Sequence, residues 1–242
     1  MIGCPCNTCR SSDPHDRRLR PSIHLAVQNG PSVLVDTSTD LRQQALTHGL
    51  TRLDAILFTH SHADHVMGLD EVRRFNMIQR AAIPAYADER TAQDLRRTFD
   101  YIFNPPTEAA GGVPQIALQT IDGPFAFDRL SITPVPIFHG SRPILGFRFG
   151  SLAYLTDCSA IPESSFALLE RLDVLVLDAL RHRPHPTHFS VSEALAVVER
   201  LAPKQTYLTH ICHDLPHAAT NQSLPAEVEL AYDGLTLDVQ VS

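Results

Sequence analysis

The sequence lacks the features of a membrane, secreted or nucleic-acid-binding protein. Its longest apolar runs, such as Val174–Leu177, are far too short to span a bilayer. The start, Met1–Arg10, lacks the charged and then apolar blocks of a secretory signal. The sequence has fewer basic than acidic residues: 20 Lys and Arg and 27 Asp and Glu give a net charge of −7. Binding a long nucleic acid needs clustered positive charge, so we expect neither a membrane nor a long nucleic acid as a partner.

Tryptophan is absent and cysteine is scarce, yet the few cysteines are crowded together. Of the 5 cysteines, three occur within the first nine residues, as Cys4, Cys6 and Cys9. An odd number with such crowding is a poor disulfide framework, whereas closely spaced thiolates are typical of metal sites. We therefore expect a cytoplasmic protein with an N-terminal zinc-binding segment at residues 1–15.

The composition and the apolar pattern predict one α/β domain that covers residues 1–242. Hydrophobic residues make up 43% of the chain and charged residues 19%, so there is enough apolar material for a core. Nearly continuous apolar runs, typical of strands buried on both faces, alternate with helical patterns, which favours a layered α/β architecture. Helices are predicted at Leu41–His48, His65–Phe75, Thr91–Phe103, Glu163–Leu172 and Val191–Leu201. The Pro- and Gly-rich stretch Asn104–Pro114 is predicted to be an irregular loop.

The strongest functional signal is a histidine-rich segment directly after the predicted strand Leu53–Phe58. It places four candidate metal ligands within six positions: His60, His62, Asp64 and His65. Imidazole and carboxylate groups suit zinc, manganese or iron. The alternative is a polar loop with surface histidines, and three histidines in six positions beside an aspartate make it the weaker interpretation.

Further candidate ligands follow later strands. His139 follows Val135–Phe138, and Asp157 follows Ala153–Thr156. His210 comes directly after Thr206–Thr209. Open α/β sheets place their ligands at the carboxyl ends of strands. Each residue alone is more readily explained as structural or solvated, but the set would complete a site for two metal ions.

This pattern resembles the metallo-β-lactamase superfamily of metal-dependent hydrolases, and the resemblance covers essentially the whole chain. It implies a four-layer αββα sandwich with a dinuclear centre of Zn or Mn. It also implies the ligands of the two metals: His60, His62 and His139 for one, Asp64, His65 and His210 for the other, and Asp157 as the bridge. In that superfamily, true β-lactamases tend to have Cys at the position of Asp157, while members with Asp favour phosphodiesters, and thioester hydrolases share the Asp.

A candidate general acid lies in the segment Arg181–His188, which holds two arginines and three histidines. The resemblance implies that His188 protonates the leaving group of a phosphodiester, and we count His188 and Asp64 as the catalytic residues. The other basic residues of the segment are weaker candidates for phosphate contacts: Arg181, His182, Arg183 and His185. The alternative is a basic surface loop. Ser190 and Glu193 form a capping-box pattern that predicts the start of the next helix.

The cysteine cluster supplies three thiolates, one short of a closed tetrahedral zinc site. Cys158 and Cys212 are candidates for the fourth ligand, but both lie in apolar contexts where a free cysteine is commonly a small buried residue. His213 is better placed, because it follows His210 by three residues. An incidental or redox cluster is the alternative interpretation.

The motif C-x-C-x-x-C near the start, together with Thr209-His210-x-x-His213, resembles the PhnP-type phosphoribosyl 1,2-cyclic phosphate phosphodiesterases of phosphonate breakdown. The resemblance implies one structural zinc bound by Cys4, Cys6, Cys9 and His213. Relatives begin with a strand and a Gly-rich turn before the cysteine motif, whereas this chain starts at Met1-Ile2-Gly3-Cys4.

We therefore expect a hydrolase that acts on a small cyclic phosphodiester, and a homodimer because relatives are often dimers. Three alternatives stay open: a PqqB-like protein of cofactor biosynthesis, a thioester hydrolase of the same fold, and a non-catalytic metalloprotein. Ribonuclease Z shares the metal motif but carries a long tRNA-binding arm, and only Gly140–Thr156 lies between His139 and Asp157 here. That length and the acidic net charge disfavour a ribonuclease.

Overall fold

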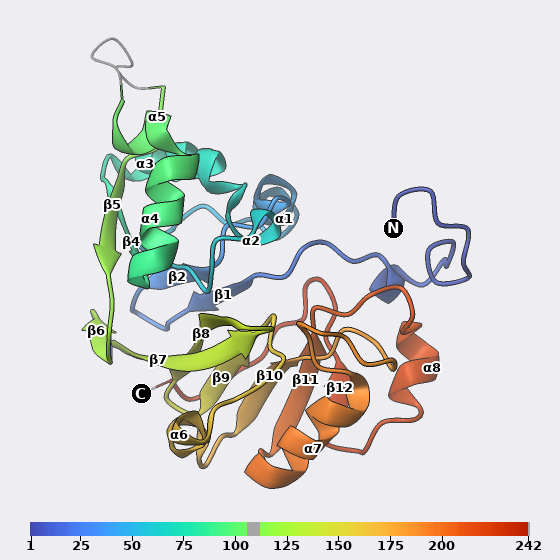
Figure 1. The fold of residues 1–242 in the computed structure, drawn as a ribbon. Helices are drawn as coiled ribbons and strands as arrows, with labels where there is room; N and C mark the ends of the chain where they lie inside the picture. Colours follow the sequence, from blue (N-terminus) through green and yellow to red (C-terminus); the bar gives the residue numbers. More distant parts are fainter. Residues whose placement is uncertain (106–111, 242) are drawn as a thin grey trace. The chain divides into compact units, whose positions relative to one another are not determined.

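The computed structural model describes residues 1–105 and 112–241 (Figure 1). Contacts within the chain group it into two compact units. Unit 1 comprises Met1–Leu19 and Ser131–Ser242, and unit 2 comprises Arg20–Leu130. The single domain over residues 1–242 stays a prediction, and residues 106–111 of the expected loop Asn104–Pro114 lie outside the described residues.

Unit 2 is built on a mixed sheet with the strand order β1-β2-β3-β4-β5. Its strands are β1 (Ile23–Ala26), β2 (Ser32–Val35), β3 (Ala55–Leu57), β4 (Ile83–Ala87) and β5 (Ile116–Thr120), and β6 (Phe125–Phe127) follows. β1 pairs antiparallel to β2, while β2, β3, β4 and β5 pair in parallel. Every residue of β2 and β3 is buried, as their continuous apolar sequences predict.

The helices of unit 2 are short. They are α1 (Leu41–Thr47), α2 (Ala63–Val66), the 3-10 turn η2 (Leu69–Val72), α3 (Arg73–Gln79), α4 (Glu89–Thr98) and α5 (Asp100–Phe103). Figure 1 shows α4 lying along β4 and β5, which it contacts. Apolar residues of the helices and the sheet share one core: Leu34, Leu41, Ile56, Phe58, Val66, Leu69, Ala85 and Leu95 belong to it.

The prediction of one helix over His65–Phe75 is wrong, because the segment breaks into α2, η2 and α3. The break falls at Gly68, whose backbone passes so close to another segment that an added Cβ would lie 2.1 Å from the carbonyl oxygen of Ser38. Only glycine allows this approach, and glycine weakens a helix. The predicted helix Thr91–Phe103 likewise divides into α4 and α5 at Phe99, which has non-helical backbone angles.

Unit 1 is built on a second mixed sheet, in which its strands follow the order β12-β11-β10-β9-β8-β7. The strands are β7 (Leu130–His139), β8 (Arg142–Phe149), β9 (Leu152–Leu155), β10 (Val174–Asp178), β11 (Gln205–Thr209) and β12 (Val228–Leu230). β7, β8 and β9 pair antiparallel, whereas β9 to β12 pair in parallel. The parallel strands therefore bring residues 157, 178 and 210 to one edge of the sheet.

The helices of unit 1 flank this sheet. They are the 3-10 turn η1 (Pro14–Asp16), α6 (Glu163–Phe166), the 3-10 turn η3 (Ala167–Leu169), α7 (Val191–Leu201) and α8 (His217–Asn221). α7 begins and ends at the predicted residues, and Ser190 and Glu193 form the predicted capping box. The helix predicted at Glu163–Leu172 is wrong in length, because only α6 and η3 form there.

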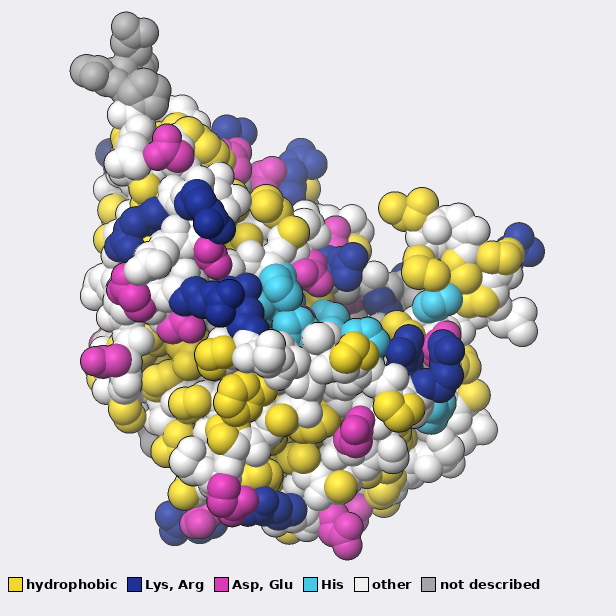
Figure 2. All heavy atoms as spheres, in the orientation of Figure 1, with side chains coloured by type: hydrophobic (Ala, Val, Ile, Leu, Met, Phe, Trp, Pro, Cys, Tyr) yellow, Lys and Arg dark blue, Asp and Glu magenta, His cyan; other side chains and the backbone are white. Residues whose placement is uncertain are grey.

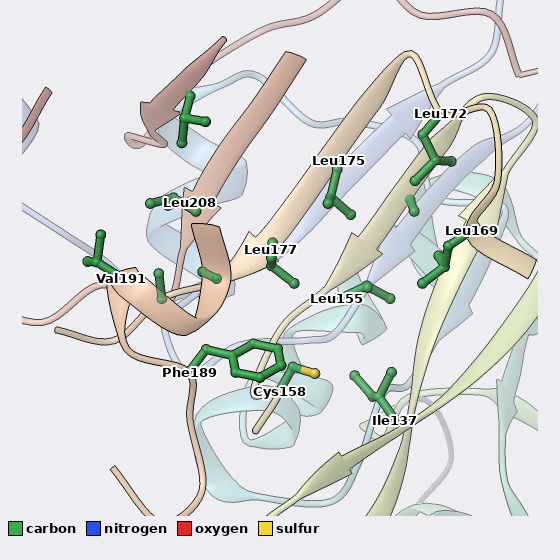
Figure 3. Close-up of a cluster of buried hydrophobic side chains, with 14 of the residues drawn as sticks. Ile137, Leu155, Cys158, Leu169, Leu172, Leu175, Leu177, Phe189, Val191 and Leu208 are labelled. Carbon is green, nitrogen blue, oxygen red and sulfur yellow. The ribbon is translucent and has the colours of Figure 1, made fainter. Parts of the chain in front are cut away.

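The core of unit 1 explains the role of Cys158. Figure 3 shows its thiol among apolar side chains that include Ile137, Leu155 and Phe189. Cys158 is fully buried, and burial raises the pKa of its thiol well above the ordinary value. It is therefore a core residue and not a fourth zinc ligand, which agrees with its apolar sequence context.

The α/β prediction is confirmed, since two mixed sheets with helices make up the structure. Among residues 1–105 and 112–241, no helix has both the length and the apolar character that crossing a bilayer requires.

Candidate functional site

Unit 2 holds the histidine-rich segment in the turn between β3 and α2. The ring centroids of His60 and His62 lie 4.5 Å apart, and those of His60 and His65 lie 4.3 Å apart. Three imidazoles are therefore packed against one another, because the sharp turn after a buried strand aims them in a common direction. Several histidine side chains also reach the surface of the molecule, as the cyan spheres in Figure 2 show.

A buried carboxylate, Asp36, orients two of these rings. Its Oδ1 accepts a hydrogen bond from the backbone N–H of Thr59 at 2.9 Å, and its Oδ2 accepts from the Thr59 hydroxyl at 2.8 Å. The same Oδ2 lies 2.8 Å from Nδ1 of His65, and both side chains are fully buried. The Thr59 hydroxyl donates to Asp36, so it accepts from Nδ1 of His60 at 3.0 Å. Both histidines thereby keep Nε2 as the nitrogen for a metal.

Burial determines the electrostatics of this network. It raises the pKa of the Asp36 carboxyl, while the ring of His65 and the hydrogen bonds from Thr59 act in the opposite direction. Asp36 also has φ 65°, in the left-handed region that an aspartate tolerates better than most residues. The strained backbone and the buried charge are both stabilised by the contacts to the histidine-rich turn.

The remaining ligand candidate of unit 2, Asp64, lies at the start of α2. Its Oδ2 is 3.4 Å from Nη1 of Arg20 and 3.9 Å from Nε2 of His65. The side chain is a quarter exposed, at 25%. The carboxylate is therefore accessible to solvent, and a carboxylate oxygen is a suitable ligand for a divalent cation.

Unit 1 gathers a second set of donors at the carboxyl ends of its strands. Donor atoms of Asp157, His188 and His210 all lie within 4.8 Å of one another. The rings of His188 and His210 are stacked, with centroids 4.7 Å apart. Oδ1 of Asp157 is 3.3 Å from Nε2 of His210, and Oδ2 is 3.9 Å from Nε2 of His139. His139, at the end of β7, donates from Nδ1 to the carbonyl of Thr187 at 2.7 Å, so its Nε2 can coordinate.

A second buried carboxylate, Asp178, organises this set as Asp36 organises the first. It accepts from the backbone N–H groups of Asp157 at 3.1 Å and Phe189 at 3.0 Å, and its Oδ1 lies 3.1 Å from Nδ1 of His188. Burial raises the pKa of Asp178 well above the ordinary value. Burial also lowers the pKa of His139, which favours the neutral imidazole that metal binding requires.

Backbone strain marks the same positions. Asp157 has φ 54° and His210 has φ 55°, both in the left-handed region. Each such residue costs on the order of 1–2 kcal/mol relative to an ordinary conformation, and this strain persists where the surrounding structure requires it. Its occurrence at two predicted ligands is typical of a functional site.

The other basic residues of the Arg181–His188 segment contact their own loop. Arg181 donates from Nε to the carbonyl of Arg183 at 3.2 Å and from Nη2 to that of Pro184 at 3.1 Å. Arg183 pairs with Asp214 at 3.0 Å, and Nδ1 of His185 lies 3.3 Å from the backbone nitrogen of Thr187. These contacts shape the loop that carries His188. Phosphate contacts by this loop stay a prediction.

The N-terminal cysteines lie beside His213, within unit 1. Donor atoms of Cys4, Cys6, Cys9 and His213 all lie within 4.8 Å of one another. Nδ1 of His213 is 3.4 Å from Sγ of Cys4 and 3.3 Å from Sγ of Cys6. The backbone N–H of Cys9 and the ring of His213 lower the pKa of Cys6 to about 6, so this thiol is largely a thiolate at neutral pH. Three cysteines and one histidine in this cluster fit a structural zinc ion.

Cys212 has a different role from its neighbour His213. Its carbonyl oxygen accepts a hydrogen bond from Arg18, which also donates to the carbonyl of Leu215. The backbone N–H of His217 donates to Asp16 at 2.9 Å. Residues near the start of the chain are therefore fixed to the loop after β11 independently of the cysteines.

The sequence analysis missed Asp36 and Asp178. Each directly follows or ends an apolar strand, β2 or β10, which is the signal that marked Asp157. The donor chemistry of each unit fits divalent metals, because the rings of His60, His65 and His139 each present Nε2 while an oxygen atom holds Nδ1. A seven-ligand centre built from both units stays a prediction.

Comparisons with known proteins identify the family. The model of the beta-lactamase superfamily domain matches residues 32–211. The "Octanoyltransferase" of Porphyromonas gingivalis is 36% identical to this chain over 240 residues. The match covers 97% of this chain but 48% of that protein, so the chain spans about half the length of this relative. The coenzyme PQQ synthesis protein B of Xanthomonas axonopodis is 26% identical over 200 residues, covering 70% of this chain and 63% of that protein.

Two solved structures have the same fold. A "New Diphosphatase from the PhnP Family" has a TM-score of 0.92 and 46% identity, covering 99% of this chain and 92% of that one. Zinc-bound PqqB from Methylobacterium extorquens has a TM-score of 0.76 and 22% identity, covering 98% and 95%, and shows the fold alone. The chain therefore belongs to the metallo-β-lactamase superfamily.

Proposed function

We propose that this chain is a metal-dependent hydrolase of small phosphodiesters, such as a ribosyl 1,2-cyclic phosphate. The observation that carries the proposal is the cluster of Asp157, His188 and His210, in which a buried histidine with its own carboxylate partner lies among ligand-type side chains. A site that only stores a metal needs no such histidine. A site that must protonate a leaving oxygen does.

The proposal assigns the metal ligands as the superfamily resemblance implies. One metal would be held by His60, His62 and His139, the other by Asp64, His65 and His210, with Asp157 shared between them. Two divalent ions there would make hydroxide available at neutral pH and would stabilise the negative charge that develops on the phosphoryl oxygens. Asp157 offers an oxygen ligand, which suits hard metals such as manganese as well as zinc.

Side chains and backbone groups of the chain have separate roles in this proposal. Asp36 and the carbonyl of Thr187 hold His65 and His139 by Nδ1, which fixes both ring orientations before substrate binds. Asp178 accepts from Nδ1 of His188, so the proton that His188 delivers to the leaving oxygen comes from Nε2. In a cyclic diester the leaving oxygen stays attached to the sugar, and a positioned acid that protonates this oxygen completes ring opening.

A diphosphate ester is the second candidate substrate. It is favoured by one observation, the 46% identity to a structure described as a PhnP-family diphosphatase. An acyl thioester belongs in the same test, because thioester hydrolases share the bridging aspartate and a relative carries the name octanoyltransferase. That relative is about twice as long as this chain, so its name does not assign an activity to the shared half.

The experiment compares substrates on protein loaded separately with zinc and manganese. A ribosyl 1,2-cyclic phosphate, a linear aryl phosphodiester, a diphosphate ester and an octanoyl thioester are assayed under one set of conditions. We expect turnover of the phosphodiesters. Turnover confined to the thioester would contradict the proposal, and no turnover with full metal occupancy would favour a binding or PqqB-like role.

His188→Ala tests the general acid directly. We expect turnover to fall about 10²- to 10⁴-fold while the metal content stays that of the wild type. His48→Ala is the matched control, because His48 is exposed at the end of α1. Near-normal turnover of His188→Ala would contradict the role of His188 as the general acid.

A further inference from the structure

The backbone of Arg20 is held by two side chains, one from the residue that precedes α1 and one from within α1. Its N–H donates to Oδ2 of Asp40 at 2.7 Å, and its carbonyl oxygen accepts from Nε2 of Gln44 at 2.8 Å. The Gln44 side chain is itself held, since its Oε1 accepts from the hydroxyl of Ser38 at 2.8 Å. All these groups belong to unit 2. The starting point of the Arg20 side chain is therefore set by the fold.

From this anchored position the guanidinium reaches Asp64. Nη1 of Arg20 lies 3.4 Å from Oδ2 of Asp64, and the Arg20 side chain is 56% exposed against 25% for Asp64. An arginine has five N–H donors, so this one long contact does not use up the hydrogen-bonding capacity of the guanidinium. The charged group thus lies beside a candidate metal ligand and is open to a ligand from solution.

An ion pair alone does not mark a binding residue. Arginine and lysine side chains lie beside acidic ones at several places on the face drawn in Figure 2, and exposed pairs contribute little to stability. Arg52, for example, pairs with Asp54 at 2.8 Å and is 62% exposed. Arg20 differs because its partner is a candidate ligand and its backbone is held at both the N–H and the carbonyl.

We propose that Arg20 binds the anionic phosphate of the substrate and makes the site selective for anionic over neutral esters. The proposal rests on the proposed function for the identity of the anion. A planar guanidinium matches two phosphate oxygens and keeps its charge at all relevant pH values. If Asp64 bound a cation, its attraction for Arg20 would weaken, and the guanidinium would be able to donate to a phosphate.

The test measures anion binding separately from catalysis, on the full chain loaded with metal. Inorganic phosphate is titrated by calorimetry into wild type, Arg20→Gln and Arg52→Gln, and the metal content of each is measured by elemental analysis. Arg20→Gln removes one charged hydrogen-bonding group. We therefore expect its affinity for phosphate to be about 10- to 100-fold weaker than that of wild type. Arg52→Gln should bind phosphate within about twofold of wild type, and Arg20→Lys should recover part of the loss.

Kinetics provide the second readout. With a linear aryl phosphodiester, KM should rise about 10- to 100-fold in Arg20→Gln while kcat changes by less than about threefold. Unchanged phosphate affinity in Arg20→Gln would overturn the proposal, because Arg20 would then be unnecessary for anion binding. Loss of metal from Arg20→Gln would also overturn it, because Arg20 would then only support Asp64. If wild type hydrolyses no phosphodiester, the proposed function fails, and the phosphate titration still decides whether Arg20 binds anions.

Discussion

Replacing Asp36 with asparagine would exchange one oxygen for an NH₂ group in a fully buried network. Asparagine tolerates the positive φ of this position as aspartate does, so the backbone should not move. Its remaining oxygen can still accept from the N–H of Thr59. The NH₂ group would replace Oδ2, which now accepts from both the Thr59 hydroxyl and Nδ1 of His65.

The substitution has two separable consequences. The lost hydrogen bonds to a charged acceptor should lower the free energy of unfolding by about 1.5–3 kcal/mol. In addition, an NH₂ group facing His65 would require Nδ1 to become an acceptor, which moves the ring proton to Nε2. A protonated Nε2 cannot coordinate a metal, and the loss of such a supporting partner typically weakens metal affinity about 10- to 100-fold.

Two measurements check this reasoning: urea unfolding of the metal-free protein, and metal affinity by competition with a chelator. Asp70→Asn is the control, because Asp70 also accepts from a side chain, that of Tyr101, but is partly exposed on η2. We expect both quantities to fall in Asp36→Asn and neither in the control. Wild-type metal affinity in a correctly folded Asp36→Asn protein would refute the tautomer argument.

Three further perturbations test other parts of the structure. Cys6→Ser should remove one tightly held metal per chain, measured by elemental analysis, and an unchanged count would contradict the structural zinc. Burial lowers the pKa of His217, so the unfolded state binds that proton first as pH falls below about 6.5; this contribution to stability is full above that pH and declines below it, and His217→Gln should flatten the decline in urea midpoints measured from pH 7.5 to 5.5. Gly68→Ala would place a Cβ 2.1 Å from the Ser38 carbonyl oxygen, and should lower the urea-unfolding free energy by about 1–3 kcal/mol; a change near zero would show that the turn can relax.

The sequence was informative where chemistry depends on local order. A buried strand followed by a polar residue puts that residue at the sheet edge, so Asp157 and His210 could be named as candidates from their neighbours alone. Asp36 and Asp178 carry the same signal but were not singled out, because an aspartate after a strand is also common in turns. Their full burial depends on the elements around them and is visible only in the folded chain.

Tertiary contacts explain where sequence patterns misled. The apolar periodicity of residues 65–75 continues through Gly68, so it predicts an unbroken helix. The break arises from the backbone of Ser38, a segment distant in sequence, and no local pattern records it. Likewise, the contact of Arg20 with Asp64 joins residues 44 positions apart, and nothing in the segment around Arg20 predicts it.

The cysteine cluster is completed by a residue 209 positions after its first member. A ribosome makes the three thiols first and the histidine 209 positions after Cys4. Until His213 has been made these thiols lack this partner, and a chain released before His213 keeps them exposed to oxidation. A metal ion in this cluster would therefore distinguish chains that include His213 from chains that end before it.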